Sequence, residues 1–338
     1  MAGPVRLREI AAKARVSVAT VSLALRGSER LPETTRRRIA ALAEKLGYQS
    51  HPYVSAFMSW RRTGGVLQRP TIALLHAYSA GDGWRKYRSF TVREMHRGVL
   101  ERLEARGYAA EQFRIGATRP TRLVEILRAR GITGLVFAPI PQADVTYDFP
   151  LSDFSVMQIG TGPAGLALPR VAHDHYHGAL EAVRGGVKRG YRRPGLIIDP
   201  AHDARLQHVW RAGFEMGLVE HGLARGAIFP LAENSPDPEA LKTWLKQKKP
   251  DVLITNLHQL VEKLLGEIGW AVPENIALVS LSVPALGDRV SGIYQNGHLI
   301  GTQAVDQLAS ALQLHRTGGL TDAITTLVAG RWNEGKTC

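Results

Sequence analysis

The first fifty residues carry apolar side chains at helical spacing in three short, successive segments. Residues 7–14 place four of them on one side of a helix, at i, i+3, i+4 and i+7. Ser17 is a good N-cap for a second helix, and a third begins near Pro32 and ends at Gly47. The predicted inward-facing residues are Leu7, Ile10, Ala11, Ala14, Val21, Ala24, Leu25, Ile39, Leu42, Ala43 and Leu46. Three such helices with a tight turn between the first two predict a helix-turn-helix unit.

The second predicted helix has an unusually apolar outer face. Opposite its inward residues it presents Val18, Ala19, Ser22, Leu23 and Arg26. Apolar groups can contact the thymine methyl in the major groove, while the Ser22 hydroxyl and the Arg26 guanidinium can reach base edges or phosphates. The face therefore favours a DNA-recognition helix over a helix that the rest of the protein buries on both sides.

From residue 70 onward, short apolar runs alternate with amphipathic stretches. Runs such as "TIALLHA", "GLVFAPI" and "IALVSLS" are typical of buried strands, and "REMHRGVLERLEARGY" and "LVEKLLGEIG" are typical of helices. This alternation predicts an α/β fold in which helices cover both faces of parallel sheets. Such sheets bind ligands at the carboxyl ends of their strands.

Charge is concentrated at the start of the chain. Of a net charge of +13, residues 1–70 contribute +9, from 13 Lys and Arg against 4 Asp and Glu, and the remaining residues contribute +4. A basic region of this kind suits the neutralisation of nucleic-acid phosphates, although a solvated basic face that aids solubility would have the same composition.

Other features limit the possible functions. The single cysteine, Cys338, allows no internal disulfide, and neither a signal peptide nor a membrane-spanning run is found, so we expect a cytoplasmic protein with no membrane partner. The chain lacks the G-x-S-x-G, Walker and H-E-x-x-H motifs. His173, His175 and His177 alternate and could bind a metal on an extended segment, but structural or pocket-lining roles are favoured. We expect no metal, no other cofactor and no enzymatic activity.

The segment "LREIAAKARVSVATVSLALRGSERLPETTRRRIAALAEKLGY" resembles the DNA-binding headpiece of the lactose-repressor (LacI/GalR) family of bacterial transcription regulators. The resemblance covers residues 5–60, with the SVATVS core in register. It implies a homodimer that binds a pseudo-palindromic operator in double-stranded DNA. The positions that it implies for phosphate contacts are Ser17, Thr20, Ser22, Thr35 and Tyr48, and those for base reading are Val18 and Ala19.

Two residues depart from the family pattern in this segment. Leu23 stands where relatives often have Arg or His, and leucine cannot hydrogen-bond a base edge, so we expect an A·T pair opposite this position. Arg15 stands where the turn glycine is usual, and a left-handed backbone there would cost roughly 1 kcal/mol.

Residues 51–69 correspond to the hinge helix of the family, which orders on operator DNA and inserts an apolar wedge into the minor groove. His51, Val54 and Phe57 fall where relatives commonly have Asn, Ala and Leu. A plain linker with a few apolar residues is the alternative.

The resemblance continues to about residue 332 and implies a two-lobed core like that of periplasmic sugar-binding proteins, with Rossmann-like lobes and crossings near residues 161, 291 and 323. The expected domains are a headpiece at 1–50, a hinge helix and linker at 51–69, and an effector-binding and dimerisation domain at 70–338.

The effector pocket departs from the sugar-binding pattern. Trp210 and Ser282 stand where sugar-binding relatives often have Arg and Asp, whereas Asn256 matches a family pocket position. After the first strand, Tyr78, Trp84, Arg85 and Arg88 suit a stacked or anionic ligand, but they could equally be rim and core residues. A sugar or sugar-like effector is the family default, and the chemical class of the effector stays open.

These features together predict a sequence-specific DNA-binding regulator, a repressor, that a small molecule controls. Two alternatives stay open: a solute-binding or enzymatic two-lobed protein with an accessory basic domain, and a regulator that has lost its response to ligand. The sequence ends without a leucine heptad tail, so we expect a dimer rather than a coiled-coil tetramer.

Overall fold

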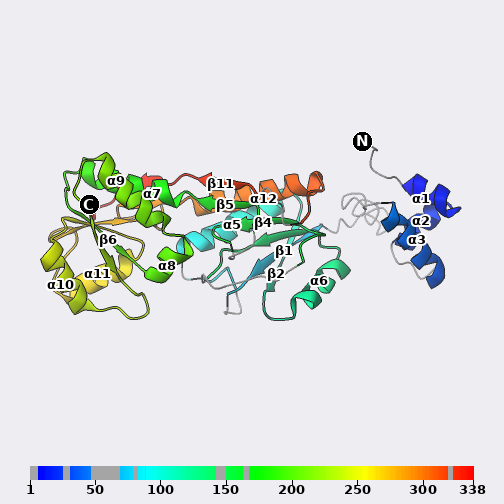
Figure 1. Ribbon diagram of the computed structural model, residues 1–338, viewed down its shortest axis with the longest axis horizontal. Coiled ribbons are helices and arrows are strands. Elements are labelled where there is room, and N and C mark those ends of the chain that lie inside the picture. Colours follow the sequence, from blue (N-terminus) through cyan, green and yellow to red (C-terminus); the bar gives the residue numbers. More distant parts are fainter. Residues whose placement is uncertain are drawn as a thin grey trace. The chain divides into compact units, whose positions relative to one another are not determined.

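The computed structural model describes residues 7–25, 31–46, 69–78, 83–87, 89–141, 150–162, 167–318 and 323–338. The chain forms two compact units, Met1–Pro70 and Thr71–Cys338 (Figure 1). Several predicted functional residues lie outside the described ranges: Arg26, Tyr48, His51, Val54, Phe57 and Arg88. The same holds for residues 51–68, where the hinge helix is expected.

The first unit contains three short helices, α1 (Leu7–Ala14), α2 (Val18–Leu25) and α3 (Glu33–Lys45). Their inward faces form one small core, in which the buried side chains are Ile10, Ala11, Ala14, Val21, Ala24, Ile39 and Ala43. Leu7, Leu25, Leu42 and Leu46 pack around it and are only partly buried. The predicted helix-turn-helix unit is confirmed, because the helical spacing of apolar residues places each helix's stripe against the other two.

The turn between α1 and α2 keeps the left-handed conformation that glycine favours, although the residue is arginine. Arg15 has φ 55°. The Val16 N–H donates to the Ala11 carbonyl (3.1 Å) and the Arg15 N–H to the Ala12 carbonyl (3.3 Å). This is the Schellman pattern, which ends a helix sharply and satisfies two of its last carbonyls. Only three residues therefore separate the end of α1 from the start of α2.

The second unit contains two sheets, each six-stranded within the described residues. The first has the order β11-β5-β4-β3-β1-β2 and is parallel throughout, and the second has the order β12-β10-β9-β8-β6-β7, in which only β12 is antiparallel. The strands are β1 (Thr71–His76), β2 (Ala109–Arg114), β3 (Gly134–Phe137), β4 (Ser155–Ile159), β5 (Arg170–His173), β6 (Pro194–Ile198), β7 (Ala227–Pro230), β8 (Val252–Thr255), β9 (Ala277–Ser280), β10 (Gly292–Tyr294), β11 (Thr325–Val328) and β12 (Arg331–Asn333).

Helices cover both faces of each sheet, as the alternating pattern predicts. In the first lobe, α5 and α12 lie on one face and α6 on the other (Figure 1). In the second lobe, α7 and α9 cover one face and α10 and α11 the other. The helices are α5 (Phe90–Ala105), α6 (Pro120–Ala129), α7 (His175–Lys188), α8 (Pro200–Arg205), α9 (Val209–Glu220), α10 (Pro238–Lys248), α11 (His258–Glu267) and α12 (Gly297–Gln313). Each sheet separates two apolar cores, which explains why its central strands are buried throughout.

The chain crosses between the lobes later than the predicted positions near residues 161, 291 and 323. The crossings follow β5, β10 and β11, near residues 174, 296 and 329. The reason is strand pairing: β5 and β11 form adjacent parallel strands of the first sheet, with Arg170 opposite Thr325. Both strands must therefore be completed before the chain can leave the first lobe.

Candidate functional site

The outer face of α2 is the first candidate site. Val18 is 40% exposed and Ala19 is also exposed, while Ser22 and Leu23 are partly exposed. The opposite side of the helix is held by Val21 and the rest of the core described above. Exposed apolar side chains on a surface helix become buried when another molecule binds over them. This face is therefore suited to contact another molecule.

The start of α2 is fixed by the side chain of Ser17. Its Oγ accepts a hydrogen bond from the Thr20 N–H (3.0 Å) and lies 2.8 Å from the Thr20 Oγ1. This is the cap that the sequence predicts, and it satisfies one of the free N–H groups of the first turn. Ser17 and Thr20 thereby lie beside Val18 and Ala19 at the N-terminal end of the helix. Thr35, in the first turn of α3, is half-buried.

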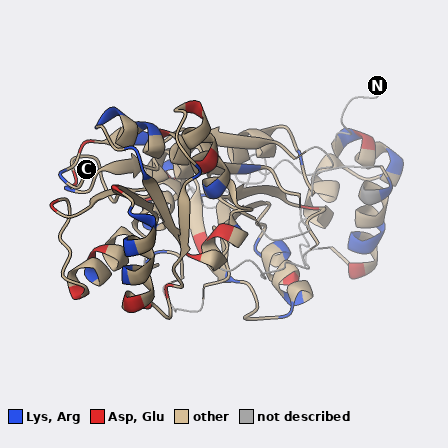
Figure 2. Ribbon diagram, turned by 60° about the vertical axis from the view of Figure 1, so that its left-hand side comes forward, with Lys and Arg blue, Asp and Glu red and all other residues tan. Residues whose placement is uncertain are grey.

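Basic side chains lie on the exposed surface of the same unit. Lys13, Arg15, Arg37 and Arg38 are exposed, and Arg37 forms an ion pair with Glu33 on its own helix (2.5 Å). Figure 2 shows Lys and Arg as blue segments along these helices, where red is sparse. Exposed cations around an apolar helix face can neutralise the charges of a polyanion that binds there.

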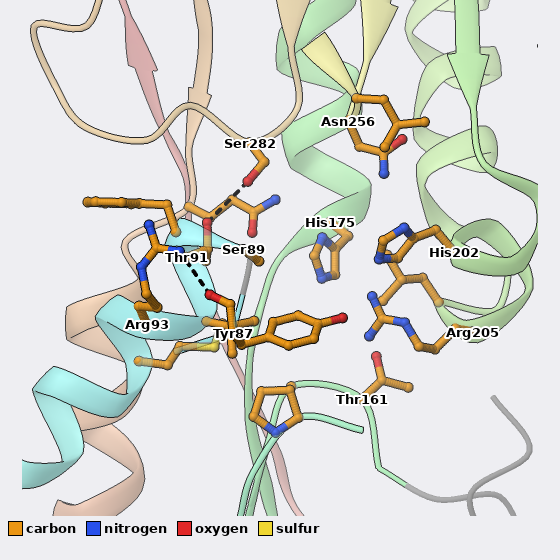
Figure 3. Close-up of a pocket in the computed structure, with 18 of the residues that line it drawn as sticks. Tyr87, Ser89, Thr91, Arg93, Thr161, His175, His202, Arg205, Asn256 and Ser282 are labelled. Atoms are coloured by element: carbon orange, nitrogen blue, oxygen red, sulfur yellow. Dashed lines mark hydrogen bonds between the residues drawn. The ribbon is translucent and has the colours of Figure 1, made fainter. Parts of the chain in front are cut away.

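The second candidate site is a cleft of about 420 Å³ between the two lobes of the second unit (Figure 3). Its walls come from segments that directly follow the carboxyl ends of strands. Tyr78 follows β1, Thr161 follows β4, Asn256 follows β8 and Ser282 follows β9. This is where the parallel topology predicts a ligand site, and a cleft of this volume can hold a small metabolite.

The cleft contains four of the residues predicted for it, namely Tyr78, Trp210, Asn256 and Ser282. The prediction that Trp84 lines the cleft is wrong. Its ring is fully buried in the first-lobe core, and its Nε1 donates a hydrogen bond to the Val92 carbonyl (2.8 Å). Arg85 is exposed and does not line the cleft either. The chain turns Trp84 inward because an indole ring gains more from the apolar core than from a wet cleft.

Several lining residues carry no sequence signal strong enough to single them out. Tyr87, His202 and Arg205 belong to this group, and they lie together at the centre of the cleft in Figure 3. The hydroxyl end of Tyr87, from the first lobe, points toward the guanidinium of Arg205, from the second. The approach of Tyr87 to Arg205 depends on how the two lobes pack. The rule that ligands bind near the ends of parallel strands therefore predicts the region of the cleft but not these two residues.

Aromatic and imidazole rings form much of one wall. His175 lies edge-on to both Trp210 (ring centroids 4.9 Å apart) and His173 (4.8 Å). Burial, with the nearby His173, Arg205 and His202, holds the pKa of His175 well below its ordinary value of 6.5, so this imidazole is neutral at pH 7. In the described part of the chain, Trp210 Nε1 and Asn256 Oδ1 have no hydrogen-bond partner. Unpaired buried polar atoms in a cleft wall are groups that a ligand can satisfy.

The three alternating histidines do not meet at one point: the rings of His173 and His175 are in contact, whereas His177 pairs with Asp174. The His177 Nδ1 lies 2.7 Å from Asp174 Oδ2, and Asp174 also caps α7 by accepting from the His177 N–H (3.1 Å). His173 instead contacts the carbonyl of Val328 through Nδ1 (3.2 Å). The described residues contain no group of three His, Cys, Asp or Glu that could hold a metal ion. The helix that begins at His175 breaks the extended geometry that a shared face would need.

Comparison with known proteins gives a matching family model for each of the two units. The model of the lacI family of bacterial regulatory proteins matches residues 6–51, and the model of a periplasmic-binding-protein-like domain matches residues 183–338. The chain therefore carries a lacI-family headpiece and a periplasmic-binding-protein-like domain. The resemblance stated from the headpiece motifs and the predicted fold class, a helical headpiece with a two-lobed α/β core, are thereby confirmed.

Individual relatives of this protein are distant. An uncharacterised HTH-type transcriptional regulator in the aml 5′ region of Streptomyces limosus is 30% identical over 204 residues. That alignment covers 58% of this chain and 53% of the relative, so it spans about half of the relative's length.

Two solved structures show the same fold along nearly the whole chain. The transcriptional regulator CelR in complex with cellobiose has a TM-score of 0.58 at 17% identity, and the alignment covers 99% of this chain and 100% of that one. The lac repressor dimer bound to operator and the anti-inducer ONPF has a TM-score of 0.57 at 16% identity, covering 99% of each chain. In addition, none of the helices that the structure describes is long and apolar enough to span a membrane.

Proposed function

We propose that this protein is a sequence-specific DNA-binding transcriptional regulator, a repressor, that acts as a homodimer and is controlled by a small molecule bound in the cleft. The observation that carries the proposal is the exposed apolar face of α2, formed by Val18 and Ala19 on a helix whose start Ser17 caps. Such a helix can enter the major groove and read thymine methyl groups.

The division of labour between the units supports this function. The proposed domains are the headpiece at 1–50, the hinge and linker at 51–69 and the effector domain at 70–338. Ligand that binds one arrangement of the lobes better than the other would shift the protein toward that arrangement. The affinity for ligand and the affinity for operator DNA are then reciprocally coupled. A ligand that weakens operator binding must itself bind more weakly to the operator-bound protein.

In vitro selection of double-stranded DNA with the full-length protein tests the proposal. We expect enrichment of a pseudo-palindrome. Ala19→Asp should abolish enrichment because it places a negative charge on the outer face of α2, next to the DNA. Ala12→Asp, the same change on an exposed position of α1, is the matched control and should retain it. Equal enrichment by wild type and Ala19→Asp would contradict the assignment of α2 as the recognition helix.

Deletion of residues 1–60 distinguishes the regulator from a two-lobed solute-binding protein or enzyme. The regulator loses DNA binding and its effect on transcription, whereas the rival protein keeps its activity in full. Sedimentation of the full-length protein with and without its selected duplex measures whether two chains bind each duplex, as the homodimer requires.

A further inference from the structure

Arg205 is a cation of the cleft for which the described residues supply no carboxylate partner. It is the last residue of α8, in the second lobe, and it lines the cleft. Among the described residues it has no ion pair, and its Nη1 makes one long hydrogen bond, 3.5 Å, to the carbonyl of Ile140 in the first lobe. A guanidinium has five N–H donors in a rigid fork, so most of its capacity is unused.

The surroundings of Arg205 do not replace the hydration that its guanidinium loses on burial. Burial lowers the pKa of the guanidinium, against an opposing effect of the Tyr87 and Tyr78 hydroxyls. Figure 3 shows Arg205 between His202 and Thr161, with Tyr87 pointing toward it. None of these three neighbours is a carboxylate. A cation withdrawn from water without an anion loses hydration that nothing else replaces, so an anionic ligand would gain an unusually strong contact here.

The rest of the cleft combines neutral polar side chains, such as Thr161 and Asn256, with a wall of rings. Within the described lining, Glu233 is the only carboxylate, and no ion pair joins it to Arg205. The Ser282 Oγ, just after β9, lies 3.1 Å from Thr91 Oγ1, so these two hydroxyls hydrogen-bond each other. Trp210 and His175 provide a ring-lined wall in which the Trp210 Nε1 and the His175 Nδ1 have no hydrogen-bond partner among the described residues.

We propose that the effector of this protein is a small organic anion whose carboxylate or phosphate group pairs with Arg205 and whose planar or apolar body packs against Trp210. This inference rests on the proposed function, since it assigns the ligand of the same cleft. An anion there would contact Arg205 of the second lobe and the Tyr87 hydroxyl of the first. It would therefore stabilise the arrangement in which the lobes approach each other.

Calorimetric titration of the full-length protein without DNA tests the proposal. The probes are benzoate and phenyl phosphate, with benzamide as the neutral isostere of benzoate and glucose as the neutral sugar. We expect at least one anion to bind with a Kd of about 1 mM or lower, at least about tenfold tighter than benzamide or glucose. The tighter of the two anions identifies the carboxylate or the phosphate as the preferred group.

Variants assign the contact to Arg205. Arg205→Met should weaken anion binding by at least about tenfold, and Arg205→Lys should retain part of it, because lysine keeps the charge but not the bidentate fork. Arg225→Met, an identical change at an exposed arginine, should leave binding unchanged. Arg205→Met removes a charge that has no partner among the described residues, so we expect its Tm to equal or exceed that of the wild type.

Three outcomes would overturn the proposal: neither anion binds, benzamide or glucose binds as tightly as the anions, or both Arg205 variants bind them like the wild type. The readout does not involve DNA. A protein that binds benzoate through Arg205 but selects no operator would refute the proposed function and keep the anion site, and the opposite result would refute only the anion site.

Discussion

Gly301 of α12 lies against the main-chain carbonyl of Met95 on α5, so closely that a Cβ at position 301 would overlap the carbonyl oxygen. The same approach recurs one turn away, where a Cβ on Gly98 would overlap the carbonyl oxygen of His298. Arg102 reinforces the contact through a two-pronged pair with Asp306 (2.7 and 2.8 Å). The two helices that cover one face of the first lobe are thus in direct backbone contact.

Gly301→Ala should destabilise the protein by about 2 kcal/mol, because α5 and α12 must separate to admit the methyl group. Urea unfolding measures the change. Gly266→Ala is the matched control, since position 266 is an exposed helical site with open space around its Cβ, and there alanine should stabilise by about 0.5 kcal/mol. Similar unfolding midpoints for both variants would show that the helices are not in backbone contact.

Arg15→Gly should stabilise the headpiece by about 1 kcal/mol, because glycine adopts the left-handed conformation at position 15 without steric cost. Hydrogen exchange of the α1 amides in the full-length protein measures this change. Lys13→Gly, two residues earlier and inside the helix, should instead destabilise by about 1 kcal/mol. Faster α1 exchange in Arg15→Gly than in the wild type would contradict the left-handed turn.

Leu23→Arg should change the base preference at one position of each half-site. The wild-type leucine can contact a thymine methyl and favours A·T, whereas arginine can bind guanine O6 and N7, a difference of about 1 to 3 kcal/mol. Parallel selections with the two proteins measure the preference, and the unchanged positions of the half-site act as the internal control. An invariant G·C pair opposite position 23 in the wild-type selection would contradict the hypothesis.

Stability should fall as the pH drops from about 6.5 toward 4. Burial lowers the pKa of His173 to about 4, against the smaller opposing effects of the Val328 carbonyl and Asp174. The unfolded chain therefore takes up the proton first, and the stability contributed by neutral His173 is complete above pH 6.5 and lost as the pH falls toward 4. At pH 4 this loss is about 3 kcal/mol.

His173→Gln should reduce this pH dependence, measured from urea midpoints between pH 7 and pH 4.5. The dependence should not vanish, because His96 is also buried and its pKa is likewise lowered to about 4 by burial, Arg85 and His76. A slope in His173→Gln equal to that of the wild type would show that folding does not lower the pKa of His173.

The sequence could predict those features that depend on local periodicity. The spacing of Ile10, Ala11 and Ala14 defines the inner face of α1, and Val21 defines that of α2, so the outer face that carries Val18 follows by geometry. The strand ends predict the region of the cleft in the same way, because parallel strands expose their carboxyl ends on one edge.

The features that depend on packing between distant segments could not be predicted. The lobe crossings follow from the pairing of β5 with β11, whose residues Arg170 and Thr325 lie far apart in the sequence. Trp84 follows a strand, as a cleft residue should, yet the core binds its ring more favourably. The position of Arg205 depends on the six-residue helix α8 and on the approach of the other lobe. No hydrophobic periodicity in the sequence predicts either feature.

Sequence-specific recognition by α2 is measured by the affinity of the full-length protein for its selected duplex and for a scrambled duplex of the same composition, titrated across salt concentration. We expect a preference of at least about 10³ for the selected duplex at physiological salt, and binding to both duplexes that weakens steeply as salt rises. Equal affinity for the two duplexes would contradict sequence-specific recognition by α2 and leave only a basic surface that binds nucleic acid without selectivity.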